Sequence, residues 1–204
     1  MDSGKPPPFS VCTGAPYLKV EGDGSQGQYA RMTCERHCLT GFTEAVVLDT
    51  ETTGLDSETD RIVSVSALLI DFEQASRDRQ LTAKTFNARI NPGVPIPEAA
   101  RRVHGIRDAD VAAEQPFSAI ADQLREFIGK RPLIGHNVQF DKRFLNAELK
   151  RAGHRMLTKN KGYCTQARFK EHMETLYDDR KRFWKLDEML SEMGIEGRAT
   201  GTHD

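Results

Sequence analysis

The feature that most constrains the fold is a short apolar run that ends in two acidic residues. Residues 44–50, EAVVLDT, read as a strand with apolar side chains on both faces, so it belongs inside a sheet that is covered on both sides. Asp49 and Glu51 are two residues apart, and strand alternation points both to the same side. Two carboxylates that close repel each other unless a cation lies between them or one is protonated. A divalent metal ion at the strand end is one answer.

Strand-like and helix-like segments alternate along the rest of the chain. Strands are expected at 44–50, 61–72, 82–90 and 132–135, and helices at 97–103, 117–128, 140–152 and 186–193. Apolar residues recur at helical spacing most clearly over 117–128. Strands first, then alternation of strands and helices, predict an α/β sandwich with a mixed sheet.

Residues 1–43 differ from the segment that follows. They are rich in glycine and proline and have no sustained apolar period, so we expect a poorly ordered extension. One domain is then expected over residues 44–204. The N-terminal residues lack the apolar core of a signal peptide, and no apolar run approaches the ~20 residues that span a bilayer. We therefore expect a soluble, cytoplasmic protein that binds no membrane.

The overall charge gives no global basic field. Lys and Arg total 29 against 30 Asp and Glu, for a formal net charge of −1. This balance argues against non-specific binding to duplex nucleic acid. It still allows an enzyme that holds a nucleic-acid end through metal ions and a few local cations.

A second acidic block follows the strand expected at 132–135. The stretch GHNVQFD ends at Asp141, in the first turn of an expected helix. By itself Asp141 fits the helix dipole, and Asp49 with Glu51 fits ordinary acids near a turn. Ligands of open α/β sheets bind beyond the carboxyl ends of strands, however, so the three carboxylates can converge. Such oxygen ligands suit Mg²⁺ or Mn²⁺, and two ions ~3.5–4 Å apart stabilise the attacking and leaving oxygens of phosphodiester displacement.

Together with a histidine near the end of the sequence, these blocks resemble a known family. DTETTGL, GHNVQFD and His203 are similar to the motifs of the DnaQ-like DEDDh 3′–5′ exonucleases, which include the proofreading epsilon subunits of bacterial DNA polymerase III. The stretches INPGVPIPEAARRVHGI and KLDEMLSEMGI extend the resemblance, which covers about Glu44 to the end. It implies an RNase H-like fold, a mixed five-stranded sheet flanked by helices.

The resemblance also implies a role for each matching residue. Asp49 would bridge two Mg²⁺ or Mn²⁺ ions, Glu51 would bind one of them, and Asp141 would complete the acidic site. His203 would take a proton from the attacking water, a task that suits a side chain titrating near neutrality. The residues expected against the terminal nucleotide are Thr52, Thr53, Leu55, His136 and Asn137. The product would be a nucleoside 5′-monophosphate, cut from single-stranded DNA, with RNA as an alternative substrate and a DNA polymerase as a candidate partner.

The sequence departs from the family pattern at the last motif. The family has a His followed five residues later by an Asp, whereas here Asp204 directly follows His203. Neighbouring residues of a helix do not share a face, so Asp204 cannot replace the missing ligand. We therefore expect an exonuclease domain truncated at its C-terminus, with the last helix missing and metal binding weakened. The alternative function is a catalytically impaired nucleic-acid-binding or polymerase-associated module.

Residues 180–185, RKRFWK, combine cations with the only Trp of the chain. They could guide a single strand by phosphate contacts and base stacking. The interpretation we favour is a solvated loop whose Phe183 and Trp184 anchor it to the core.

Overall fold

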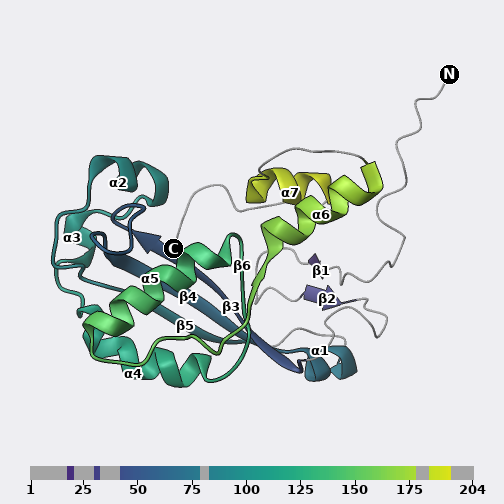
Figure 1. Cartoon of the computed structure of the whole chain (residues 1–204), viewed down its shortest axis with the longest axis horizontal. Helices are drawn as coiled ribbons and strands as arrows, with labels where there is room; N and C mark the ends of the chain where they lie inside the picture. Colours follow the sequence, from purple (N-terminus) through teal and green to yellow (C-terminus); the bar gives the residue numbers. More distant parts are fainter. Residues whose placement is uncertain (1–17, 21–29, 33–41, 79–82, 178–183, 194–204) are drawn as a thin grey trace.

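The architecture is a mixed sheet with helices on its faces (Figure 1). The computed structural model describes residues 18–20, 30–32, 42–78, 83–177 and 184–193. The strand order is β5-β4-β3-β6-β7, in which β3, β4 and β5 are antiparallel and β6 and β7 run parallel to β3. The strands are β3 Glu44–Thr52, β4 Ile62–Asp71, β5 Ala83–Arg89, β6 Leu133–Gly135 and β7 Gly162–Cys164. The predicted class, a mixed five-stranded sheet flanked by helices, is confirmed.

The helices agree with the predicted segments in part. They are α1 Phe72–Asp78, α2 Glu98–His104, α3 Asp108–Val111, α4 Phe117–Ile128, α5 Val138–Arg151, α6 Thr165–Tyr177 and α7 Leu186–Glu192. The bounds of α4 are those predicted, whereas α5 begins two residues before the predicted start at 140. Helices α1, α3 and α6 and strand β7 were not predicted, because they are short or weakly amphipathic.

The main core lies between the sheet and helices α4 and α5. Val46 and Leu48 of β3 belong to it, together with Phe117 and Leu124 of α4 and Phe144 of α5. Each of these side chains is almost completely buried, and such burial is worth ~1.5–3 kcal/mol per large apolar side chain. Because Val46 and Leu48 face this core, strand alternation turns the odd-numbered residues of β3 to the opposite side.

A separate, smaller core lies between α6 and α7, which pack side by side away from the main layers (Figure 1). Its buried members are Phe169, Met173, Trp184 and Met189. The ring of Trp184 meets that of Phe169 edge-on, with the centroids 5.1 Å apart. Trp184 is thus an anchor, as favoured from the sequence, but for the α6–α7 pair rather than for the main core. Phe183 and the cations at 180–182 lie outside the described residues.

Two short strands are described within the N-terminal residues 1–43. Strands β1 Leu18–Val20 and β2 Ala30–Met32 pair antiparallel in a separate two-stranded sheet. The other residues up to 41 lie outside the described part, so the predicted poor order stays a prediction. Among the helices that the structure describes, none is long and apolar enough to cross a membrane.

Candidate active site

The end of β3 presents its acidic and hydroxyl side chains on opposite sides. Asp49 is exposed and Glu51 half-buried, whereas Thr50 and Thr52 are buried. Thr50 and Thr52 share the face of Val46 and Leu48, which α4 and α5 cover. The two carboxylates therefore lie on the other face, as the alternation predicted.

Asp141 lies at the end of β3 because the neighbouring strand β6 is shorter than β3. The amide of Val46 donates to the carbonyl of Pro132 at 2.9 Å, so the even-numbered amides of β3 point towards β6. Strand β6 ends at Gly135, before it can pair with Thr50. The Asp141 carboxylate takes the place of a strand partner: its Oδ1 accepts from the Thr50 amide at 3.0 Å and from Thr50 Oγ1 at 2.8 Å.

Asp141 has a carboxyl group whose ionisation is strongly perturbed by its surroundings. The side chain is buried in the first turn of α5, and burial raises its pKa to about 6. The negative charge of Asp49 raises this pKa further, while the hydrogen bonds from Thr50 oppose the shift. Asp49 and Asp141 thus lie within electrostatic reach of each other. Both Thr50 bonds end on Oδ1, which leaves Oδ2 outside that pair of bonds.

The donor atoms fit a hard divalent cation. Carboxylate oxygens are the ligands that Mg²⁺ and Mn²⁺ prefer, and a cation here would relieve the repulsion between Asp49 and Asp141. Within the part of the chain that the structure describes, no group of three or more His, Cys, Asp or Glu side chains is arranged to hold a metal ion. Glu51 therefore stays a predicted third ligand.

The end of β3 and the loop that follows it carry three of the residues predicted to contact the nucleotide. The Thr52 hydroxyl donates to the carbonyl of Gly54, and that of Thr53 donates to Asp60. Both threonine side chains are buried, so their hydroxyls hold the loop itself. Leu55 is different, because 83% of it is exposed. Of these three residues, Leu55 is the one with an exposed side chain, and its contact with the nucleotide stays a prediction.

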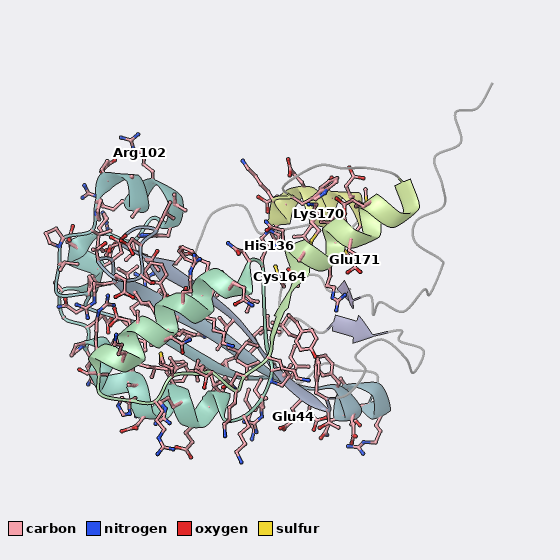
Figure 2. The ribbon with its side chains drawn as sticks, viewed as in Figure 1. Glu44, Arg102, His136, Cys164, Lys170 and Glu171 are labelled. Atoms are coloured by element: carbon pink, nitrogen blue, oxygen red, sulfur yellow. The ribbon has the colours of Figure 1, made fainter. Side chains whose placement is uncertain are left out.

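His136 and Asn137 form the connection between β6 and α5. The Nε2 atom of His136 lies 3.0 Å from the Trp184 carbonyl oxygen, and Nδ1 lies 3.4 Å from Thr165 Oγ1. Figure 2 shows His136 close to the α6–α7 pair. Because a carbonyl only accepts, Nε2 is assigned the proton. Asn137 is exposed and has a φ of 65°, in the left-handed region, which lets the chain turn from strand to helix within two residues. His136 therefore faces the α6–α7 pair, and the backbone of Asn137 makes the turn into α5; the predicted contacts of both residues with the nucleotide stay predictions.

Two further residues matter for the predicted site. Thr50 orients Asp141 but was missed, although alternation already placed it on the side facing the helices. The predicted general base, His203, lies outside the described residues, as does the whole segment from 194 onward. Its role remains a prediction.

Comparison with known proteins gives a consistent family signal. A family model described as "Exonuclease" (RNase_T) matches residues 46–204. The DNA polymerase III subunit epsilon of Rickettsia conorii is 41% identical over 105 residues, which are 51% of this chain and 43% of that subunit. The epsilon subunit of Pasteurella multocida is 28% identical over 166 residues, covering 79% of this chain and 62% of that protein. The chain thus spans about half the length of the curated relatives that it matches.

Solved structures support the same fold. A product-bound exonuclease I superposes with a TM-score of 0.63 at 17% identity, covering 77% of this chain and 40% of that one. E. coli exonuclease I in complex with a dT13 oligonucleotide gives a TM-score of 0.61, also at 17% identity, over 76% of this chain and 36% of the other. At this level of identity the likeness concerns the fold.

Proposed function

The chain belongs to the RNase_T exonuclease family, and we propose that it is a metal-dependent 3′–5′ exonuclease that acts on single-stranded nucleic-acid ends. The observation that carries this proposal is the pairing of two carboxylates, Asp49 on β3 and Asp141 on α5, at the carboxyl end of a central strand. The burial of Asp141 and its repulsion by Asp49 disfavour the doubly ionised pair, a cost that a bound cation would relieve near neutral pH. The pair is therefore a reason to expect a bound metal.

Each protein group has a proposed task in the reaction. Asp49, Glu51 and Asp141 would hold divalent ions, which when bound would stabilise the charge on the attacking and leaving oxygens. Thr50 fixes Asp141 through two hydrogen bonds, so this carboxylate keeps one orientation. His203 would accept a proton from the water that attacks the terminal phosphodiester. The products would be a nucleoside 5′-monophosphate and a strand shortened by one nucleotide.

The substrate and partner follow from the relatives. Exonuclease I has been crystallised with dT13, and the epsilon relatives are named as subunits of DNA polymerase III. We propose single-stranded DNA as the substrate, with RNA as an alternative, and a replicative DNA polymerase as the partner in a proofreading role. A chain with that role would act in the cytoplasm.

The test is release of labelled nucleoside monophosphate from a 3′-labelled single-stranded oligonucleotide in Mn²⁺. The wild type should release it, and Asp49→Ala should reduce release to background. Asp122→Ala is the matched control, because Asp122 is a strongly exposed carboxylate on α4, away from the end of β3. Activity that survives Asp49→Ala would contradict the proposal.

A second readout separates an enzyme from a binding module. Mn²⁺ should raise the melting temperature of the wild type but not that of Asp49→Ala, because an ion that binds only the folded state stabilises it. Oligonucleotide binding without cleavage, in a chain that Mn²⁺ does not stabilise, would instead identify the catalytically impaired module.

A further inference from the structure

The loop between β3 and β4 is closed on itself by its own polar groups. The Thr53 amide donates to the Arg61 carbonyl at 2.9 Å, and the Arg61 amide donates back to Thr53 Oγ1 at 3.0 Å. Asp60 accepts from the Thr53 hydroxyl at 3.2 Å and from the Asp56 amide at 2.9 Å. A Cβ on Gly54 would lie 2.3 Å from Asp60 Oδ2, so a larger residue there would have to displace the Asp60 side chain from its hydrogen bonds. The exposed Leu55 thus projects from a loop of defined shape.

Three charged side chains fasten this loop to α5, and we call them the loop clamp: Arg61, Glu148 and Arg151. Glu148 is buried, with 1% of its surface exposed. Arg61 donates two hydrogen bonds to it, from Nε to Oε1 at 2.6 Å and from Nη2 to Oε2 at 3.1 Å. Arg151 donates to the same Oε1 at 3.2 Å and also to the loop carbonyls of Ser57 at 2.6 Å and Glu58 at 2.8 Å.

The clamp and the acidic site share one helix. Asp141 and Glu148 are seven residues apart on α5, which is about two turns, so both lie on the same face. Asp141 holds the end of β3 through Thr50, and Glu148 holds the loop that follows β3 through Arg61. Helix α5 therefore sets the distance between the carboxylates and the loop that carries Leu55. A bidentate guanidinium–carboxylate pair fixes orientation as well as distance.

We propose that the loop clamp is a set of positioning residues that holds Leu55 in register with the acidic site, so that the terminal nucleotide of a single strand is seated for cleavage. The inference rests on the proposed exonuclease function. The clamp residues are not expected to touch the reacting atoms. They act through the loop, so their loss should weaken productive substrate binding and leave metal binding unchanged.

A matched pair of substitutions tests the clamp. Arg61 and Arg131 are each 30% exposed, and each donates from Nε to a glutamate, at 2.6 Å to Glu148 and at 2.7 Å to Glu44. Only Arg61 belongs to the loop. Lysine keeps the charge at either site but loses the bidentate fork. Arg61→Lys should raise KM for a single-stranded oligonucleotide by ~10-fold or more, because small misplacements are costly, whereas Arg131→Lys should leave KM unchanged.

The metal requirement distinguishes a positioning role from a general loss of structure, because a general loss of structure would also change the Mn²⁺ concentration that the enzyme needs. The Mn²⁺ concentration for half-maximal activity should be the same in the wild type and in Arg61→Lys, since Thr50 and β3 hold the carboxylates independently. Equal effects of Arg61→Lys and Arg131→Lys on KM would overturn the proposal. So would a shifted Mn²⁺ requirement in Arg61→Lys.

Hydrogen exchange tests the clamp even if the chain cleaves nothing. Glu148→Gln removes the charge but keeps the size of the side chain, and it should speed exchange of the Thr53, Asp56 and Asp60 amides by ~10-fold or more while the β3 amides stay protected. Unchanged exchange in the loop would overturn the clamp, whatever the activity. Faster loop exchange in a chain that neither binds nor cleaves oligonucleotides would support the clamp as a loop anchor but overturn its role in seating a substrate.

Discussion

The β3–α5 region and the α6–α7 pair are built in different ways. In the first, side chains far apart in the sequence are joined by short polar contacts, such as Thr50 to Asp141 and Arg61 to Glu148, beside fully buried apolar groups. In the second, four buried side chains form a core of their own. Among the described residues, His136 joins this pair to the β6–α5 connection, because it contacts Thr165 and the Trp184 carbonyl.

The comparison shows where precision is needed. The acidic pair lies in the region with long-range contacts, so its geometry is tied to the main core. The α6–α7 pair depends on a small local core, and such units can open at a free energy below that of global unfolding. His203 follows α7 in the sequence. The predicted role of His203 would therefore depend on a stretch of chain that follows the α6–α7 pair, which is anchored less strongly than β3 and α5.

The largest expected effect separates the main core from the α6–α7 core directly. Phe144→Ala should lower the free energy of unfolding by ~3–5 kcal/mol, because a fully buried ring leaves a cavity in the main core. Trp184→Ala removes a side chain that is also buried, but from the smaller core. Amide exchange should then accelerate in α6 and α7, with a change under ~1 kcal/mol at the β3 amides. Equal losses at the β3 amides in both variants would mean that the molecule unfolds as one unit.

The next effect concerns Asp141, whose replacement should raise the free energy of unfolding rather than lower it. Its pKa is raised from 3.8 to about 6 in the folded chain. Folding therefore favours the protonated form of Asp141. The contribution of this group to the free energy of unfolding is fully present below pH ~4 and is lost as pH rises through ~6. Without metal, Asp141→Asn should therefore be more stable than the wild type at pH 8, by ~3 kcal/mol at most. Denaturant unfolding in EDTA at pH 4 and pH 8 measures the difference.

The asparagine keeps an oxygen that can accept from both Thr50 donors, which isolates the effect of charge. The gain should vanish towards pH 4, and added Mn²⁺ should stabilise the wild type more than Asp141→Asn. A variant that is less stable than the wild type at pH 8 in EDTA would show that the carboxylate stabilises the apo fold, contrary to this account.

A smaller effect is expected at Asn137, where the β6–α5 connection needs a positive φ. Asn137→Gly should change the free energy of unfolding little, because glycine adopts this conformation freely. Asn137→Val should cost ~1–2 kcal/mol, since a β-branched side chain is strained there. Chemical denaturation of the three proteins gives both values. A tolerated valine would mean that the turn can relax without disturbing Asp141.

What the sequence could predict depends on the range of the interaction. The alternation that separates Asp49 from Thr50 is local, so their faces were predictable, and so was the strong apolar period of α4. Helix α6 was missed because Phe169 and Met173 are its buried apolar side chains among the described ones, too few to define a period.

The missed contacts are those made between distant segments. Strand β7 is three residues long and exists through parallel pairing with β6. The pairing of Arg61 with Glu148 spans 87 residues, and nothing in either local sequence indicates it. The same holds for the contact of His136 with the Trp184 carbonyl, which spans 48 residues; the predicted place of His136 beside the nucleotide stays a prediction. Tertiary packing decides these cases, and no single-sequence pattern reports it.

The smallest effect tests how the two regions are joined. Gln166 Nε2 donates to the Trp184 carbonyl at 3.0 Å, beside His136 Nε2 at the same distance. Gln166→Leu should cost ~1 kcal/mol or less, because the histidine still satisfies the carbonyl, and His136→Leu should behave alike. The double variant leaves the carbonyl without either donor, so its loss should exceed the sum by ~0.5–1 kcal/mol. Amide exchange of α6 and α7 measures this coupling, and strict additivity would show that the two donors do not share one acceptor.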